Sequence, residues 1–129
     1  MTETELVHAA IAARNNAHAP YSHFLVGAAL EDSEGRIHTG CNIENATYGL
    51  TVCAERIAMF KALSEGARKF RRIAVVANNK QLTPPCGACR QILWEFAGDM
   101  EIILANLTGP TETLRLSAIF PRAFDATYL

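Results

Sequence analysis

The chain has 129 residues, of which 50% are hydrophobic and 19% are charged. This length and composition are typical of one compact domain, so we expect a single domain over residues 1–129 whose core needs no disulfides. Twelve Lys and Arg against thirteen Asp and Glu leave a formal net charge of −1. This balance excludes nucleic-acid binding that depends mainly on net charge.

The sequence also lacks targeting signals. It begins with acidic residues, without the basic region of a secretory signal, and no uncharged apolar run approaches the roughly 20 residues that cross a bilayer. We therefore expect a cytoplasmic protein with no membrane partner. In that compartment, cysteines are more often metal ligands or catalytic thiols than disulfides. The chain has four of them: Cys41, Cys53, Cys86 and Cys89.

Hydrophobic periodicity and turn residues predict alternating helices and strands. Thr2 and Glu5 fit a capping box before a helical pattern, and the nearly continuous apolar run 24–30 is typical of a strand buried on both faces. The expected elements are a helix at 3–16, a strand at 24–30, a return strand at 36–41, a helix at 53–65, a strand at 73–77, a helix at 87–97, a strand at 101–107 and a short strand or turn near 113–116. Strand–helix–strand alternation implies parallel pairing, and the hairpin is antiparallel. We expect an α/β fold with a mixed five-stranded sheet and helices on both faces.

Other segments carry weaker expectations. The helix at 53–65 is apolar around most of its circumference, which is typical of a buried helix. The basic run 68–72 is typical of a solvated edge between a helix and a strand. Trp94 fits the core or a subunit interface. The four histidines (His8, His18, His23 and His38) have no metal-ligand spacing, and we expect them at the surface.

The most informative feature is the segment 53–55, Cys-Ala-Glu, followed by the segment 85–89, Pro-Cys-Gly-Ala-Cys. A Cys-x-x-Cys pair alone can bind zinc or cycle as a dithiol. Three thiols with a carboxylate two residues from one of them match the zinc deaminase signature, in which the glutamate shuttles protons and is not a ligand. The sequence therefore predicts zinc ligands at Cys53, Cys86 and Cys89, and a proton shuttle at Glu55.

The predicted helices support this site. Cys53 and Cys86 fall where helices begin, and unpaired N–H groups there favour thiolates. Three protein ligands leave the fourth tetrahedral position open, as in catalytic zinc sites. Arg56 could offset part of the site's negative charge. Residues two apart in a helix point roughly 200° apart, so Cys53 and Glu55 can face one zinc only if Cys53 has non-helical angles.

At this point the chain resembles the short, tetrameric cytidine deaminases of nucleoside salvage. The resemblance runs from Tyr21 to about Phe124. The zinc signature is shared by a broad superfamily, whereas the segment 42–46, Asn-Ile-Glu-Asn-Ala, is narrower and points to free nucleosides. The shared segments are 21–30, 40–46, 53–56 and 85–91.

The resemblance implies a three-layer cytidine-deaminase-like fold and hydrolysis of cytidine and 2′-deoxycytidine to uridine and 2′-deoxyuridine, with release of ammonia. One Zn²⁺ per chain would carry a hydroxide that attacks C4 of cytosine. Glu55 would take the water's proton, protonate N3 and then protonate the departing ammonia.

The resemblance also implies substrate contacts. The backbone at Ala54 and Cys86 would contact the base, and Asn42 and Glu44 would hold the ribose hydroxyl. Phe24 would pack beside the sugar and base. Tyr48 and Phe124 resemble residues that neighbouring subunits contribute, which implies a homotetramer with shared active sites. The chain departs from the family at 83–85, where Thr-Pro-Pro replaces a single proline in the wall of the base pocket.

Several alternatives stay open. Within the enzyme class, the substrate could be a modified cytidine or a cytosine-containing antibiotic of the blasticidin type; a polynucleotide would need a basic groove. Outside it, a non-catalytic zinc module could use Cys41 as a fourth ligand. A redox dithiol at Cys86 and Cys89, or buried structural thiols, would need no metal.

Overall fold

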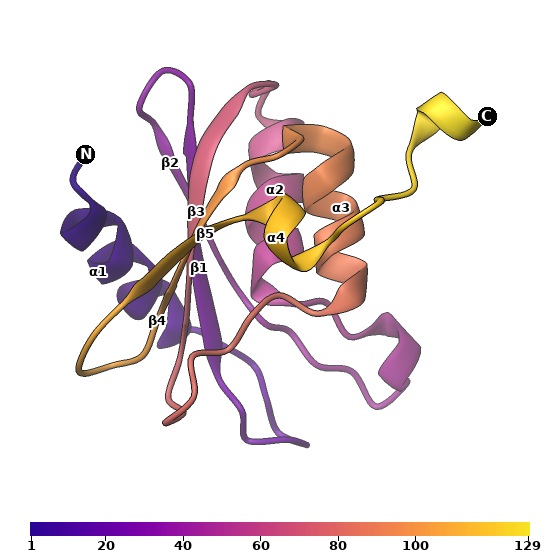
Figure 1. Ribbon diagram of the computed structural model, residues 1–129. Helices are drawn as coiled ribbons and strands as arrows, with labels where there is room; N and C mark the ends of the chain where they lie inside the picture. Colours follow the sequence, from indigo (N-terminus) through magenta and orange to yellow (C-terminus); the bar gives the residue numbers. More distant parts are fainter.

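A computed structural model describes residues 1–129 as one five-stranded sheet with helices packed against it (Figure 1). In chain order, the elements are α1 (Glu3–Arg14), β1 (Val26–Asp32), β2 (Ile37–Cys41), α2 (Ala54–Ser64), β3 (Phe70–Ala77), α3 (Gly87–Ala97), β4 (Glu101–Ala105), β5 (Glu112–Arg115) and α4 (Leu116–Ile119). Short 3₁₀ turns lie at Tyr48–Leu50 and Ala126–Tyr128. None of the helices is long and apolar enough to cross a membrane.

The strands are arranged in the order β2-β1-β3-β4-β5. β1 is antiparallel to both β2 and β3, and β5 is antiparallel to β4. β3 and β4 are parallel, and α3 makes the crossover between them. The predicted mixed sheet is therefore confirmed.

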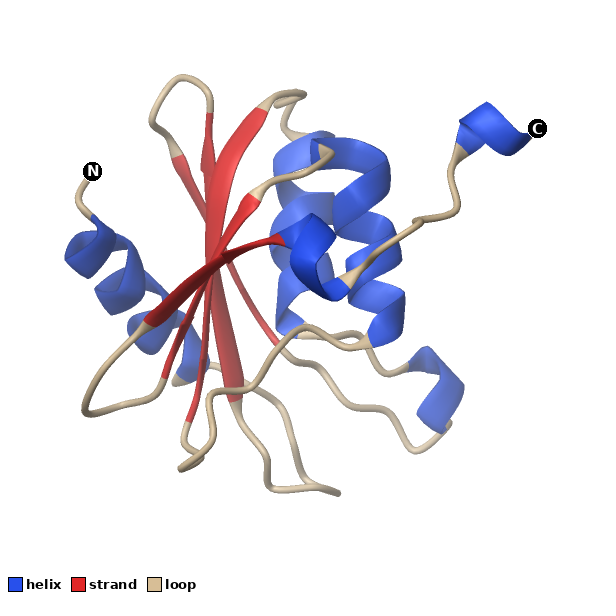
Figure 2. Cartoon of the chain, viewed as in Figure 1, coloured by secondary structure: helices blue, strands red, loops and turns tan.

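The two faces of the sheet are covered by different helices. Figure 2 shows α1 on one face, with α2 and α3 together on the other. Along β3, Ile73 and Val75 pack in the cluster under α2 and α3, whereas Ala74 and Val76 pack in the cluster under α1. Side chains alternate along a strand, so a strand covered on both faces is apolar throughout. This explains the unbroken hydrophobic runs of the sequence.

Two glycines allow α1 and α2 to lie close to the sheet. A Cβ at Gly40 in β2 would lie 2.5 Å from the Ala54 carbonyl oxygen. A Cβ at Gly27 in β1 would lie 2.0 Å from the Ala10 carbonyl oxygen. Real Cβ atoms do not approach backbone this closely, so a side chain at either position would push its helix away. Gly40 thereby fixes the depth at which the first turn of α2 sits on the sheet.

The predicted elements are confirmed with shifted ends. The N-cap half of the predicted capping box is confirmed, because the Glu5 amide donates to Thr2 Oγ1 over 3.1 Å. β3 begins at Phe70, earlier than expected, so part of the basic run is strand. Within it, Arg72 Nε donates to Glu31 Oε1 over 2.7 Å. The expectation of a solvated edge is therefore wrong for Arg72, because its partner Glu31 is buried in the neighbouring strand.

The expectation that α2 is buried around its circumference is also wrong. Its inner face is buried at Ala58, Met59 and Ala62, but the Phe60 side chain is 44% exposed. A helix that lies on one face of a sheet buries one side only, so the apolar residues around α2 predicted more burial than the helix has.

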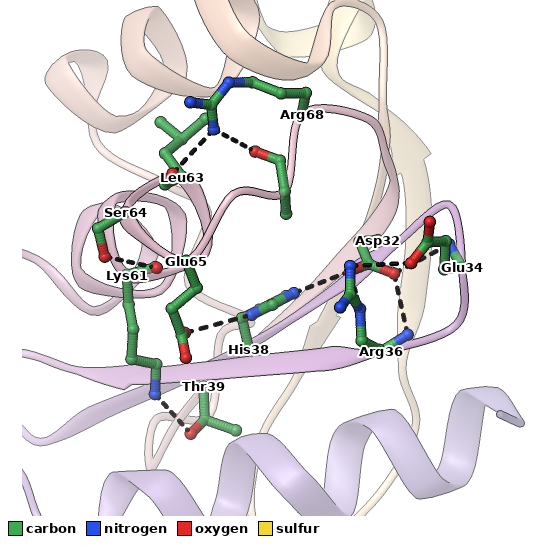
Figure 3. Close-up of polar contacts among 11 residues, drawn as sticks. Asp32, Glu34, Arg36, His38, Thr39, Lys61, Leu63, Ser64, Glu65 and Arg68 are labelled. Atoms are coloured by element: carbon green, nitrogen blue, oxygen red, sulfur yellow. Dashed lines mark hydrogen bonds and ion pairs between the residues drawn. The ribbon is translucent and has the colours of Figure 1, made fainter.

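His38 corrects the expectation that all four histidines lie at the surface. It is buried in β2, and its Nε2 lies 3.0 Å from Asp32 Oδ2, across the hairpin (Figure 3). Asp32 also accepts hydrogen bonds from the amides of Glu34 and Arg36 and from the Arg36 side chain. Burial alone would raise the pKa of Asp32, but the hydrogen bonds from His38 and these groups lower it to about 2.

Candidate active site

The three predicted zinc ligands lie at the ends of two adjacent helices. Cys53 is the N-cap of α2 and Cys86 is the N-cap of α3, while Cys89 is buried in the first turn of α3. Cys53 has φ −73° and ψ 157°, an extended backbone. This is the non-helical conformation that the sequence required for Cys53 and Glu55 to face one centre.

The sulfur atoms are spaced as a zinc site needs them. Cys53 Sγ lies 3.8 Å from Cys86 Sγ, and Cys86 Sγ lies 3.5 Å from Cys89 Sγ. A Zn–S bond of about 2.3 Å places tetrahedral sulfurs about 3.8 Å apart, so the three thiols fit this ion. All three ligand atoms lie within 4.8 Å of one another, and Cys41 is outside the group. The geometry therefore favours three cysteine ligands over four.

The surroundings of the sulfurs favour a thiolate. Hydrogen bonds from Cys89, Arg56 and Cys86 lower the pKa of the Cys53 thiol to about 5. Cys89 shares that proton and lies deeper, so its pKa is raised. Arg56 Nη2 lies 3.5 Å from Cys53 Sγ, the position from which a guanidinium offsets negative charge on the sulfurs.

Glu55 is the buried carboxyl beside these sulfurs. It is the second residue of α2 and is only 4% exposed. Burial is the main cause that raises its pKa to about 7, and the nearby Cys53 thiolate adds to the rise. A group whose pKa is close to the working pH can both accept and donate protons, which is what general acid–base catalysis needs.

A cavity of about 260 Å³ connects this centre to the loops around it. The structure brings most of the predicted site residues to its walls: Phe24, Asn42, Glu44, Cys53, Ala54, Glu55 and Cys86. Cys89 lies behind the wall as the buried member of the sulfur group. One cavity is thus lined by two of the predicted metal ligands, by Glu55 and by the loop residues, and the third ligand, Cys89, lies behind its wall.

Asn42 and Glu44 are fixed by different partners. Asn42 Oδ1 accepts from the Val26 amide over 2.9 Å, and its Nδ2 donates to the Phe24 carbonyl over 2.7 Å. The Asn42 amide therefore holds the chain at Phe24 and Val26 in place. Glu44 accepts hydrogen bonds from the Ser22 hydroxyl and from the amides of Tyr21 and Ser22, which lower the pKa of its carboxyl.

Tyr48 and Phe124 do not reach this cavity in their own chain. The Tyr48 side chain is 73% exposed and lies against Tyr21 on a second cavity of about 330 Å³, which shares Ser22, Glu44 and Thr51 with the first. Phe124 lies on the tail that projects away from the sheet (Figure 1), where Gln91 Nε2 donates to its carbonyl. The roles predicted for Tyr48 and Phe124 need a neighbouring chain and stay predictions.

Sequence reasoning missed several wall residues, namely Ser22, Val26, Thr51, Val75, Thr83 and Pro84. The departure from the family pattern at 83–85 indicated that Thr83 and Pro84 alter the wall of the base pocket, but neither was predicted as a substrate contact. Ser22 gave no signal as a site residue of its own, because its partner Glu44 is distant in sequence and only the folded loops bring the two together.

Comparison with known proteins identifies the family. The model of the cytidine and deoxycytidylate deaminase zinc-binding region matches residues 1–105. The chain belongs to this family. Its matched range contains all three cysteines of the sulfur group and Glu55. Membership favours a zinc centre over a redox dithiol or buried structural thiols.

Individual members are similar over nearly the whole chain. A cytidine deaminase of Halalkalibacterium halodurans is 50% identical over 127 residues, which cover 98% of this chain and 96% of that protein. The crystal structure of a cytidine deaminase from Burkholderia pseudomallei is 46% identical, with a TM-score of 0.93, and the match covers 96% of this chain and 100% of that one. A cytidine deaminase structure from Mycobacterium tuberculosis is 37% identical, with a TM-score of 0.85, over 97% of this chain and 98% of that one. The predicted family fold is confirmed.

Proposed function

We propose that this protein is a zinc-dependent hydrolase that converts cytidine and 2′-deoxycytidine to uridine and 2′-deoxyuridine and releases ammonia. The observation that carries the proposal is the pairing of three sulfurs spaced for one zinc ion with the buried carboxyl of Glu55. The sulfurs and the carboxyl line or adjoin one cavity of this chain, and two relatives that are 50% identical to it are named cytidine deaminases.

Each residue of the centre has a distinct task. Cys53, Cys86 and Cys89 would hold the ion, which supplies a water activated for attack on C4 of the base. Glu55 would take one proton from that water and pass it to N3. It would then take the second proton, from the hydroxyl left on C4, and pass it to the amine as the C4–N bond breaks. Its buried position keeps competing water away, and its raised pKa makes both transfers accessible near neutral pH.

The two cavities support a proposed position for the sugar. The sulfurs and Glu55 line or adjoin only the first cavity, whereas Ser22 and Glu44 line both. A base that reacts beside the sulfurs therefore directs its sugar towards Glu44. Ala54 and Cys86 line the cavity at the base end, where their backbone would contact the base, and Phe24 would offer an apolar surface beside the base and the sugar.

The assembly remains part of the proposal. Residues 1–129 form one catalytic domain in the cytosol, and four copies share active sites through Tyr48 and Phe124. Exposure of both side chains in the isolated chain, at 73% and 54%, supports a role in contacts with another copy. Sedimentation equilibrium of the wild type and of Phe124→Ala tests it, because a monomer with full activity would contradict shared sites.

The main experiment measures ammonia release from cytidine by purified protein of known zinc content, with Glu55→Gln as its partner. We expect turnover by the wild type at one zinc per chain, and no turnover by a zinc-loaded Glu55→Gln. Full activity in the variant would contradict the role of Glu55. A full zinc site with no ammonia from either nucleoside would contradict the proposed substrate.

A modified cytidine or a cytosine-containing antibiotic is the second candidate substrate. Thr83 and Pro84, the residues that depart from the family pattern, line the cavity and so shape the surface that the substrate meets. Side-by-side values of kcat/KM for cytidine, 2′-deoxycytidine, 5-substituted cytidines and blasticidin S separate the two. A higher value for a modified substrate would favour this candidate.

A further inference from the structure

We propose that Ser22 is a positioning residue that leaves Glu44 a single free acceptor, so that the site binds one sugar hydroxyl and is indifferent to the 2′-hydroxyl. This inference rests on the proposed function, because it concerns how the same cavity binds a nucleoside sugar.

The hydrogen bonds of Glu44 can be counted. Its Oε1 accepts from the Tyr21 amide over 3.0 Å and from the Ser22 amide over 3.1 Å. Its Oε2 accepts from the Ser22 hydroxyl. An ionised carboxylate has about four lone-pair sites, two on each oxygen. Three are used within the chain, so one site on Oε2 is left for a ligand.

The direction of the Ser22 hydroxyl is fixed as well. The Phe24 amide donates to Ser22 Oγ over 3.0 Å, so this oxygen acts as an acceptor towards Phe24 and as a donor towards Glu44. The two bonds form a relay from Phe24 through Ser22 to Glu44, and all three residues line the cavity. Rotating the hydroxyl away would leave Glu44 without one of its donors.

The backbone between Ser22 and Phe24 is strained to make this relay. His23 lies between them with φ +58°, a left-handed conformation that is uncommon for a residue other than glycine. The His23 amide donates to the Ala19 carbonyl over 3.0 Å, which holds the turn in place. Strain of this kind persists only where the surroundings fix it, and it is concentrated at functional sites.

The free acceptor lies where the sugar is expected. Ser22 and Glu44 line both cavities, while the sulfurs and Glu55 belong to the first alone. A vicinal 2′,3′-diol would need two acceptors on one carboxylate, and the Ser22 hydroxyl takes the second. A single acceptor must bind a hydroxyl that cytidine and 2′-deoxycytidine share, which explains how one site serves both.

The test compares kcat/KM for cytidine and 2′-deoxycytidine in the wild type and Ser22→Ala. We expect the wild type to use both substrates within about threefold of each other. In Ser22→Ala, the vacated acceptor can take the 2′-hydroxyl. The ratio of kcat/KM for cytidine to kcat/KM for 2′-deoxycytidine should therefore rise at least about fivefold, because hydrogen bonds to charged groups are the stronger ones. An unchanged ratio, with both substrates slowed equally, would overturn the proposal.

Ser117→Ala is the matched control, because Ser117 donates from its amide and its hydroxyl to the two oxygens of Asp99, and neither residue lines either cavity. We expect the wild-type ratio in this variant.

Ser22→Thr keeps a hydroxyl donor and should also keep the wild-type ratio; a raised ratio there would overturn the proposal. If Ser22→Ala fails to fold, Ser22→Cys keeps the shape with a weak donor and should show a smaller rise. Wild-type protein that releases no ammonia from either nucleoside would instead refute the proposed function itself.

Discussion

Asp32 and Glu55 are two buried carboxyls with opposite properties. Their residues are 2% and 4% exposed. Asp32 accepts hydrogen bonds from His38, from Arg36 and from two backbone amides, and its pKa falls to about 2. Glu55 lies beside sulfurs instead, and burial raises its pKa to about 7.

The difference supports a structural role for the charge of Asp32 and the proposed catalytic role for Glu55. Desolvation alone raises the pKa of either group, so the partners decide the outcome. Around Asp32 the donors outweigh desolvation, and the fixed charge ties the β1–β2 hairpin together (Figure 3). Around Glu55 desolvation prevails, which leaves a proton that can be exchanged near neutral pH.

The largest expected effect is the loss of turnover in Glu55→Gln. We expect kcat to fall by at least about 10³-fold, because the variant loses the group that accepts and donates protons. General acid–base catalysis typically contributes about 10²–10⁴-fold to a rate. The melting temperature should stay the same or rise, because an amide has no charged form to desolvate. Steady-state kinetics and calorimetry on samples of equal zinc content measure both.

Glu65→Gln is the control for this variant, because Glu65 lies at the opposite end of the same helix. Glu65 caps α2, and its side chain is 61% exposed. We expect wild-type kcat there and a change in the free energy of unfolding below about 1 kcal/mol, because its pair with His38 Nδ1, at 3.7 Å, is largely exposed to solvent. A Glu55→Gln protein that turned over normally but melted much lower would reverse the assignment, since Glu55 would then serve the fold.

Asp32→Asn should show the opposite pattern, with a loss of stability and no loss of turnover. We expect the free energy of unfolding to fall by about 3 kcal/mol, because the change removes the charge that His38 and Arg36 face. β1 separates Asp32 from the cavity wall at Val26 by about 20 Å of strand. Urea unfolding and kcat per folded, zinc-loaded chain provide the measurement, and a large fall in kcat would contradict the separation of roles.

The sequence predicted the chemistry of Glu55 but not the role of Asp32, and the reason is physical. Glu55 is recognised because zinc chemistry needs a carboxyl at a fixed short spacing from Cys53, with Cys86 and Cys89 in a second local motif. Helices and strands were predicted for a similar reason, since periodicity and caps are local. The angle between helical side chains two residues apart also gave the condition that Cys53 must have an extended backbone if it faces the same zinc as Glu55, and Cys53 does have one.

Contacts across the fold could not be predicted in the same way. Asp32 meets His38 because of the register of a hairpin, and Ser22 meets Glu44 because two loops cross at the cavity. Arg72 finds Glu31 across two paired strands, where the basic run alone suggested a solvated edge. The roles predicted for Tyr48 and Phe124 involve another copy of the chain, and they stay predictions.

The pH dependence of stability should distinguish Asp32→Asn from the wild type. The folded pKa of Asp32 is about 2, below its ordinary value of 3.8, so its contribution is full above about pH 5 and is lost as pH falls through 4 towards 2. We expect the stability difference between the two proteins to shrink by about 1–2 kcal/mol over that range. Acid also releases zinc, but it does so in both proteins, so the difference isolates Asp32. A difference that stays constant from pH 6 to pH 2 would contradict the lowered pKa.

The smallest expected effect is that of Arg36→Gln, which separates the buried partners of Asp32 from the exposed one. Arg36 Nε lies 3.2 Å from Asp32 Oδ2, but the Arg36 side chain is 62% exposed and also pairs with the exposed Glu34. Solvent screens such a pair, so we expect the free energy of unfolding to fall by less than about 1 kcal/mol. Urea unfolding of Arg36→Gln beside His38→Gln measures the contrast, with the larger loss expected for His38 because it is buried against the same carboxylate. If Arg36→Gln proved as damaging as Asp32→Asn, the charge of Asp32 would depend on the surface guanidinium, and burial with His38 would not be what holds the hairpin.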